Sequence, residues 1–238
     1  MMLVDKGFKV DVGEMTLPER KMLLMLYYDL FQVAGRFDSL EMMLDALAGD
    51  IALVNEMKMV VPVLLRRCEA YELDNGLMSP LCPLRLHGVY TKDQILVAMG
   101  TSTLERKSPC REGVERNKKL GLEAMFVDII KDREAGSTTN YNDFAQSESL
   151  FHWESQSNVS QGSKSGQNYI NETFSMFLFV RQQASFPDDK SRTMGYVFLG
   201  RVKMKSYSGD RPMKIVWELE VPMPASLLVY ADKYGLRA

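Results

Sequence analysis

The sequence predicts an α+β fold, with a helical subdomain over residues 1–105 and a β-rich domain over residues 106–238 that is most simply a small barrel. Three observations predict this division. Before residue 105, capping signals, apolar runs at helical spacing and glycine stop signals recur. After about residue 120, short runs rich in aromatic and β-branched residues replace them. Between the first two such runs lie more than forty residues with few aliphatic side chains, which is long for a loop in a compact domain.

The first helix is predicted from a capping box with an early proline, Thr16-Leu17-Pro18-Glu19, followed by an apolar run and the stop signal Gly35. Ser39 is a candidate cap for the second helix, and Pro62 should kink or divide the third. The four predicted helices span residues 16–33, 39–47, 51–73 and 91–99. Many of the 17 methionines lie in this half, where they either fill the core or form an adaptable groove for a partner.

Four strands are predicted in the second half, because aromatic and β-branched residues gather in short runs between polar turns. These predicted strands span residues 124–130, 174–180, 195–202 and 214–221. The turn sequence Ser208-Gly209-Asp210-Arg211-Pro212 separates the last two strands and predicts that they form a hairpin.

The composition is 46% hydrophobic and 25% charged, as in ordinary globular proteins, and the formal net charge of −2 excludes a polycation. Cys68, Cys82 and Cys110 are widely spaced with no C-x-x-C pair, so neither a disulfide framework nor a zinc site is predicted. No run approaches the roughly 20 apolar residues of a membrane span. We therefore expect a cytoplasmic protein with no cofactor and no membrane partner, in which nucleic-acid binding would need a local basic patch.

The long segment combines aromatic and polar residues between Tyr141 and Tyr169. Such a mixture suits a pocket for a flat polar ligand, because rings stack on the ligand while amides, hydroxyls and carboxylates bond to its edge. In the alternative interpretation, Phe151, Trp153 and Tyr169 plug the open end of the barrel while the polar residues cap turns. Composition alone leaves both interpretations open.

Catalytic motifs are incomplete in this sequence. His152-Trp153-Glu154 matches the H-x-E of zinc deaminases, but the downstream P-C-x-x-C is absent. Gly162-Ser163-Lys164-Ser165-Gly166 has lysine where a nucleophile elbow needs serine, and it lacks the length of a phosphate-binding loop. The acidic cluster Pro187-Asp188-Asp189-Lys190 is typical of a solvated turn, and His87 is expected to be structural. We predict no catalytic or metal-binding residue, so the chain is not expected to be an enzyme.

Positive charge gathers on one predicted strand. Arg201, Lys203 and Lys205 alternate with apolar residues, so strand periodicity places them on one face, and Arg211 follows in the hairpin turn. A stripe of this kind can follow the phosphates of a nucleic acid, although a solvated outer strand face has the same pattern.

A series of motifs in the second half resembles one known family. The motifs are Tyr141-Asn142-Asp143-Phe144-Ala145-Gln146-Ser147, Phe151-His152-Trp153-Glu154-Ser155-Gln156, Gly166-Gln167-Asn168-Tyr169-Ile170, Leu178-Phe179-Val180-Arg181, Phe198-Leu199-Gly200, Pro212-Met213-Lys214-Ile215-Val216-Trp217-Glu218-Leu219 and Pro222-Met223-Pro224. Together they resemble the C-terminal domain of unknown function found on bacterial superfamily-two helicases, often behind a phospholipase-D-type nuclease, as in SauUSI-like restriction proteins. The helical half is similar only at residues 83–87 and 90–91.

The resemblance implies a barrel of the PUA-like or SRA-like type that recognises modified cytosine in double-stranded DNA. Readers of that class flip the base out of the duplex, hold it between aromatic rings and bond to its Watson–Crick edge. It further implies a role as the target-recognition part of a type IV, modification-dependent restriction system used in phage defence. ATP hydrolysis and DNA cleavage would reside in helicase and nuclease domains in cis or in trans, since the chain has none of their motifs.

The family's functional roles can be transferred to residues of this sequence as expectations. For the base pocket, Tyr141 and Trp153 are expected to stack, Asp143 to accept from the exocyclic amine, Phe151 and Tyr169 to close the pocket, and Ser155 and Gln156 to add edge contacts. The residues expected to meet phosphates are Lys164, Arg201, Lys203, Lys205 and Arg211.

A protein-interaction module is the alternative function. In that case the helical subdomain docks a helicase or nuclease partner, and the barrel is a rigid support. Loss of the packing of Met43 or Leu44 should then matter more than loss of Trp153. The two functions are compatible, because a reader within a larger enzyme needs both surfaces.

Overall fold

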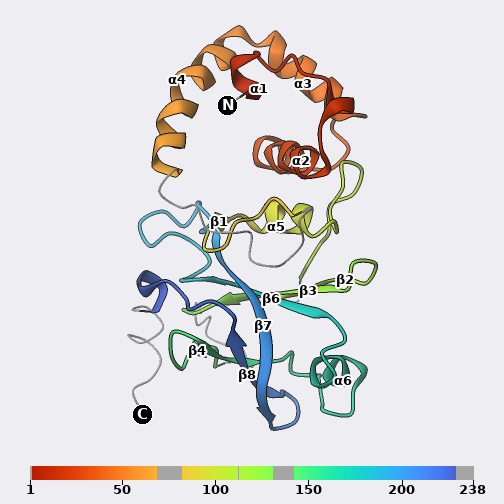
Figure 1. Ribbon diagram of the computed structural model, residues 1–238, viewed down its shortest axis with the longest axis vertical. Helices are drawn as coiled ribbons and strands as arrows, with labels where there is room; N and C mark the ends of the chain where they lie inside the picture. The colour runs from red at the N-terminus through yellow and green to blue at the C-terminus, as the bar shows by residue number, and fades with distance from the viewer. Residues whose placement is uncertain (1, 69–81, 112, 131–141, 229–238) are drawn as a thin grey trace. The chain divides into compact units, whose positions relative to one another are not determined.

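The computed structural model describes residues 2–68, 82–111, 113–130 and 142–228 (Figure 1). Within these residues the chain divides into two compact units. A helical unit contains residues 2–68, 82–83 and 93–108, and a sheet unit contains residues 84–92 and the described residues from 109 onward. The predicted α+β class, with the helices towards the N-terminus, is confirmed.

Local capping chemistry explains where the first helices begin and end. The helices before the sheet are α1 Met2–Asp5, the 3-10 turn η1 Val12–Glu14, α2 Leu17–Phe31, α3 Leu40–Gly49, α4 Ile51–Cys68 and α5 Lys92–Ala98. Thr16 and Glu19 form the predicted capping box of α2, and the Ser39 side chain caps α3. Helix α2 ends before Gly35, because Gln32 already adopts a left-handed conformation with φ of 58°. Helix α4 continues through Pro62 as one element instead of dividing there.

The helical unit has a core of its own. Tyr27 and Tyr28 are buried, and the Tyr28 hydroxyl donates to the Thr103 carbonyl oxygen over 2.6 Å. Met43 and Leu44 are also buried, so they fill this core instead of forming a docking surface. Among the described residues, no helix is both long enough and apolar enough to cross a membrane.

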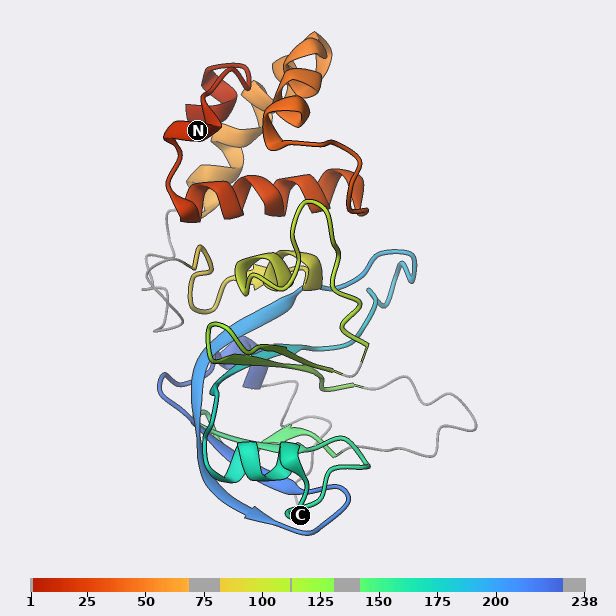
Figure 2. The ribbon, with the colours of Figure 1, turned by 90° about the vertical axis from the view of Figure 1, so that its right-hand side faces the viewer.

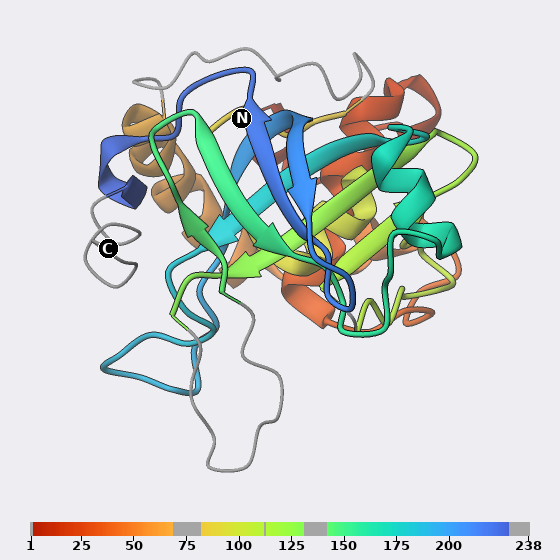
Figure 3. The same ribbon diagram turned by 90° about the horizontal axis from the view of Figure 1, so that it is seen from below.

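In the described residues of the sheet unit, eight strands form one sheet and the short helix α6 lies between β5 and β6 in the sequence. They are β1 Val89–Tyr90, β2 Val114–Asn117, β3 Leu122–Asp128, β4 Phe144–Ala145, β5 Leu150–Glu154, α6 Lys164–Ile170, β6 Ser175–Arg181, β7 Tyr196–Ser208 and β8 Lys214–Leu219. The strand order is β2-β3-β6-β7-β8-β5-β4, and β1 pairs with β7. Figure 3 shows β8 between β7 and β5. All pairs are antiparallel except β3 with β6, and β7 and β8 form the predicted hairpin.

The sheet is strongly curved but open, which corrects the expectation of a closed barrel. Strand β7 pairs with β6 in its first part and with β8 in its second, with a β-bulge against each neighbour, and it joins the two halves of the sheet (Figure 2). At the ends of the path, β2 pairs only with β3 and the two-residue β4 only with β5. No hydrogen-bonded ladder therefore links β2 to β4 in the described part of the chain.

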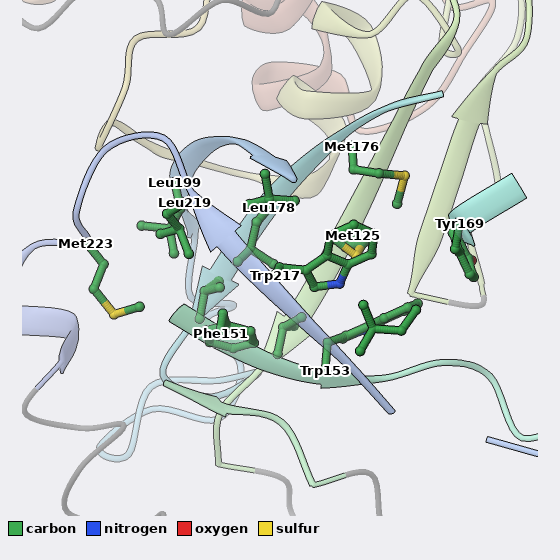
Figure 4. Packing of buried hydrophobic residues seen from close by; sticks show 14 of the residues in the cluster. Met125, Phe151, Trp153, Tyr169, Met176, Leu178, Leu199, Trp217, Leu219 and Met223 are labelled. Atoms are coloured by element: carbon green, nitrogen blue, oxygen red, sulfur yellow. The ribbon is translucent and has the colours of Figure 1, made fainter. Parts of the chain in front are cut away.

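A single hydrophobic cluster fills the space inside this curve (Figure 4). Met125 of β3 and Leu178 of β6 come from one half, and Phe151 of β5 and Trp217 of β8 come from the other. Tyr169 from α6 packs against the same cluster, with its ring 6.5 Å from that of Trp217. Burial of these large side chains from both halves stabilises the curvature.

The long segment between β3 and β6 contains regular secondary structure, namely β4, β5 and α6. Strand β5 alternates buried Phe151 and Trp153 with half-buried His152 and Glu154. This is the period-two pattern of a half-buried strand. The sequence prediction missed it because polar and aromatic residues alternate there without the aliphatic residues that marked the other strands.

Candidate functional site

A cavity of about 670 Å³ lies within the sheet unit. Its lining residues are Lys92, Arg111, Gly113, Val114, Phe126, Asp128, Asp143, Trp153, Glu154, Gln156, Ser157, Asn158, Arg181 and Tyr196. The volume is typical of a small-molecule site, for which pockets of about 300–1,000 Å³ are usual. Three cationic and three acidic side chains stand beside three aromatic rings, so the lining suits a ligand that is both flat and polar.

The cavity lies between the two unpaired ends of the sheet. Val114 belongs to β2, at one end of the strand path, and Asp143 immediately precedes β4, at the other. Phe126 and Tyr196 line it from β3 and β7, and Trp153 lines it from β5. A ligand-sized space therefore lies between the two ends of the open sheet.

Asp143 is held at the cavity by a group of short contacts with β5. Its Oδ1 accepts from the Glu154 backbone N–H over 2.8 Å, and Glu154 Oε2 accepts from the Asn142 N–H over 3.1 Å. His152 Nδ1 lies 2.7 Å from the Asn142 carbonyl oxygen, and the His152 ring stacks on Phe144 at 4.7 Å. These contacts fix residues 142–144 against β5. They also hold the His152 ring against residues 142 and 144.

The opposite wall carries cations that are held over aromatic rings. The Arg181 guanidinium lies 4.3 Å from the Tyr196 ring centroid, and it forms a two-pronged ion pair with Asp128 at 2.7 and 3.0 Å. Burial, followed by the nearby Asp128 carboxylate, raises the pKa of Tyr196, so its phenol stays protonated. Lys92 Nζ lies 5.0 Å from the Phe126 ring centroid. The ring contacts, and for Arg181 also the ion pair, therefore hold both cationic side chains in place.

Of the four aromatic residues expected at the base pocket, the three that the structure describes are mostly core residues. Phe151 and Tyr169 are buried and do not line the cavity. Trp153 does line it, but only 4% of its surface is exposed, and its ring packs edge-on against Tyr169 at 5.5 Å. Strand periodicity explains this placement, because residues 151 and 153 both point inward from β5. For Phe151 and Tyr169, the alternative interpretation as packing residues describes their positions.

Ser155 and Gln156 continue β5 into the turn beside the cavity. The buried Ser155 Oγ accepts from the Met213 N–H over 2.9 Å and donates to the Gln156 carbonyl oxygen over 3.2 Å, so Ser155 holds the backbone. Gln156 lines the cavity. Its side-chain Oε1 is buried and has no hydrogen-bond partner among the residues that the structure describes. Buried polar atoms usually have a partner, so this acceptor is an exception that needs an explanation.

Tyr141, the other expected stacking residue, lies outside the described residues. The expected phosphate-binding residues do not line the cavity. Lys203 and Lys205 project from β7 and pair with Glu220 and Glu218 at 3.3 and 2.8 Å. The sequence prediction did not anticipate these cross-strand pairs, which partly neutralise the stripe.

Lys164 and Arg211 are both exposed. Gln161, just before α6, contacts the hairpin turn between β7 and β8. Its backbone N–H donates to the Asp210 carboxylate over 2.7 Å, and its side-chain amide donates to the Gly209 carbonyl oxygen over 2.8 Å. Arg201 lies on β7 and is half-buried.

Sequence reasoning missed most of the cation and ring pairs of the cavity wall. Asp128 and Arg181 are the last residues of two apolar strands, and they are direct partners in the parallel β3–β6 register. Opposite charges at the ends of both apolar runs were a usable signal, although nothing local showed that these two strands pair. Within the described residues, no group of three His, Cys, Asp or Glu side chains is placed to hold a metal ion.

The cavity lies within the part of the chain that matches a known protein family. Residues 84–231 match the family described as a domain of unknown function, DUF3427, and this match covers more than half of the chain. Every residue that lines the cavity falls within the matched range. No curated protein matches the chain.

Proposed function

The chain belongs to the DUF3427 family, and we propose that it is a DNA-recognition module that binds modified cytosine, either 5-methylcytosine or 5-hydroxymethylcytosine, in the cavity of its sheet unit. In this proposal it is the target-recognition part of a type IV restriction system in the bacterial cytoplasm, and the PUA-like or SRA-like relationship remains part of the proposal. The observation that carries it is the cavity itself, which combines ring walls with fixed hydrogen-bonding groups inside the matched domain.

The chemistry of the lining supports a flipped base as the ligand. A pyrimidine is flat, and an enzyme or reader that extracts it from the duplex holds it by ring contacts and by bonds to its Watson–Crick edge. Asp143 and Glu154 supply carboxylate oxygens on one wall, where contacts to backbone N–H groups fix their positions. The Arg181 guanidinium, supported by Tyr196, supplies a planar cation on the other wall.

The roles assigned from the family resemblance change in detail. Asp143 remains the proposed acceptor for the exocyclic amine, and Trp153 becomes part of the wall rather than a free stacking face. Phe151 and Tyr169 support that wall from the core. For the DNA backbone, we propose Lys164, Arg211 and Arg201 as phosphate contacts ahead of Lys203 and Lys205, because carboxylates already compensate those two lysines.

The decisive experiment is a binding titration of the chain against matched duplexes that carry cytosine, 5-methylcytosine, 5-hydroxymethylcytosine or 6-methyladenine, all at one salt concentration. We expect the tightest binding to a modified-cytosine duplex, since phosphate contacts alone would give equal affinities. Equal binding to all four duplexes would exclude the proposal.

Asp143→Asn tests the cavity within the same titration. Loss of the carboxylate should weaken binding to modified duplex by about tenfold, the equivalent of one charge-assisted hydrogen bond, and should leave binding to unmodified duplex unchanged. Asp188→Asn is the matched control, because it makes the same charge change at an exposed position that does not line the cavity. A similar effect of both substitutions would show that overall charge, not the cavity, controls binding.

A second candidate function, docking of a helicase or nuclease partner, is favoured by one observation. Helix α4 exposes a series of large apolar side chains, namely Ile51, Met59, Val60, Val63 and Leu64. Because exposed apolar patches commonly mark interaction sites, Met59→Lys should reduce recovery of such a partner in a pull-down performed after nuclease treatment. Unchanged recovery would argue against this surface, whereas the buried Met43 and Leu44 would mainly report on folding.

A further inference from the structure

Arg181 is held at the cavity by contacts from three sides. Its Nε and Nη2 donate to the two carboxylate oxygens of Asp128 over 2.7 and 3.0 Å. Its Nη1 donates to the Met194 carbonyl oxygen over 3.1 Å, and the guanidinium carbon lies 4.3 Å from the Tyr196 ring centroid. Together these contacts fix both the position and the orientation of the guanidinium group.

The strand register explains why these residues meet. Asp128 and Arg181 are direct partners in the parallel pairing of β3 with β6. On the other side of β6, Arg181 and Tyr196 stand next to the Val180–Val197 pair of the antiparallel β6–β7 ladder. One neighbouring strand therefore supplies the carboxylate and the other supplies the ring, so the place of Arg181 is set by the sheet itself.

Arg181 has hydrogen-bonding capacity left over. A guanidinium group has five N–H groups, and Arg181 donates three of them to Asp128 and Met194, which leaves two. One of the two belongs to Nη1 and the other to Nη2, and neither has a partner among the residues that the structure describes. Because Arg181 lines the cavity and 12% of its side-chain surface is exposed, a molecule in the cavity can accept from them.

The other two cations of the cavity lining have different properties. Lys92 Nζ donates to the Cys110 carbonyl oxygen over 2.7 Å, and an ammonium group is a point donor without a plane. Arg111 is exposed. Among the described lining residues, Arg181 therefore combines a planar donor group with a fixed orientation. Such a group suits a ligand that has two acceptors side by side.

Cytosine has this arrangement on its Watson–Crick edge. The exocyclic amine donates, whereas the adjacent ring nitrogen N3 and the carbonyl oxygen O2 both accept. In the proposed function Asp143 accepts from the amine, and N3 and O2 are left without a partner. These two acceptors match the two remaining N–H groups of Arg181 in number and in kind.

We propose that Arg181 is a specificity-determining residue that donates its two remaining N–H groups to N3 and O2 of the flipped base, with Asp128 and Tyr196 as positioning residues. This inference rests on the proposed function and completes the set of contacts to the edge of the base. It also predicts discrimination against thymine, which carries the same methyl group as 5-methylcytosine. The N3 of thymine bears a hydrogen, which would point at a donor of Arg181.

An analogue of the base tests the contact at a single atom. The probes are two duplexes of one sequence that carry either 5-methylcytosine or 3-deaza-5-methylcytosine, in which a C–H group replaces N3 while the amine and O2 are kept. In both duplexes this base stands opposite an abasic site, so no base pair must be opened. We expect the natural chain to bind the 5-methylcytosine duplex about tenfold more tightly, since a hydrogen bond to a charged group is lost with the analogue. Equal affinities would overturn the inference, and this comparison needs no variant.

Arg181→Lys then tests whether Arg181 reads that atom. Lysine keeps a positive charge beside Asp128 but has no planar donor group, so the ratio of the two affinities should fall close to one. Arg116→Lys is the matched control. Arg116 also donates two hydrogen bonds to one carboxylate, that of Glu123, and lies 4.6 Å from the Phe174 ring centroid, but it does not line the cavity.

The control should keep the natural ratio of affinities. An Arg181→Lys chain that unfolds with heat like the natural chain and keeps that ratio would overturn the inference, as would an equal loss of the ratio in both variants. The inference fails alone if the natural chain prefers modified over unmodified cytosine but binds the two abasic-site duplexes equally. Equal binding to cytosine and 5-methylcytosine duplexes would instead overturn the proposed function, and this inference with it.

Discussion

An ion pair between β2 and β3 and an ion pair on the outer face of β7 and β8 differ in burial, although one sheet carries both. Between β2 and β3, Glu123 is completely buried with Arg116 as its partner. On the outer face, Lys205 and Glu218 each keep about half of their side-chain surface exposed, at 51% and 49%. Water and salt screen the exposed pair, whereas the buried pair cannot be broken without leaving a charge in the protein interior.

The difference in burial distinguishes the part of the sheet unit where charged side chains have fixed positions from the part where they are solvated. A buried pair keeps its side chains in one geometry, as the two hydrogen bonds between Arg116 and Glu123 do. An exposed pair can exchange its partner for solvent or for a phosphate at little free-energy cost. In the proposed function, the cavity makes the selective contacts, and the outer face makes contacts that do not discriminate between bases.

Trp153→Ala should have the largest effect on the sheet unit. The substitution removes a large ring from the core at the point where the core forms the cavity wall, and such deletions cost about 3–5 kcal/mol of unfolding free energy. Urea denaturation followed by tryptophan fluorescence from Trp217 would measure it. Tyr207→Ala on the outer face is the comparison, and it should change stability much less because Tyr207 is exposed. Equal losses would mean that Trp153 is not a core residue.

Arg116→Met should have the next largest effect. It leaves the buried Glu123 carboxylate without its partner, which costs about 3 kcal/mol, at the lower end of the usual range because Arg116 itself is partly exposed. The double variant Arg116→Met, Glu123→Gln should recover part of the loss, since no unpaired charge is then buried. Urea unfolding of the three proteins checks this, and a double variant less stable than Arg116→Met would contradict it.

Lys205→Gln should have the smallest effect. Loss of an exposed pair changes the unfolding free energy by less than about 1 kcal/mol. If the outer face also meets DNA, the same substitution weakens all duplexes by one factor and reduces the salt dependence of binding. A titration over several salt concentrations checks this. A loss confined to modified duplexes would instead assign Lys205 to base recognition.

Features with local causes could be predicted from the sequence. The capping box at Thr16 and Glu19 starts α2 where expected, because the contacts that define it span three residues. The hairpin of β7 and β8 also formed as predicted, since its turn residues lie next to the strands they join. Strand β5 and the two short end strands were missed, because their runs are brief or interrupted by polar residues.

The candidate site was only partly predictable. The sequence pointed to the region that contains Asp143, Trp153 and Gln156, and all three line the cavity. It could not show that Phe151 and Tyr169 turn into the core, because that depends on which face of β5 and α6 is covered. It also could not show that Glu218 and Glu220 compensate the lysines of β7, since the β7–β8 register decides which side chains meet.

By itself, the sequence determined the α+β class, the main helices and strands and the polar, aromatic region around β5, because local spacing and side-chain chemistry are sufficient for these. Only the tertiary structure decided that the sheet stays open, that Asp128 meets Arg181 from 53 residues away and that Gln156 presents an acceptor without a partner. These features arise from pairing between strands that are distant in the sequence. The residues next to each strand carry no signal of which strand it pairs with. The cavity exists because the two ends of that strand path do not meet.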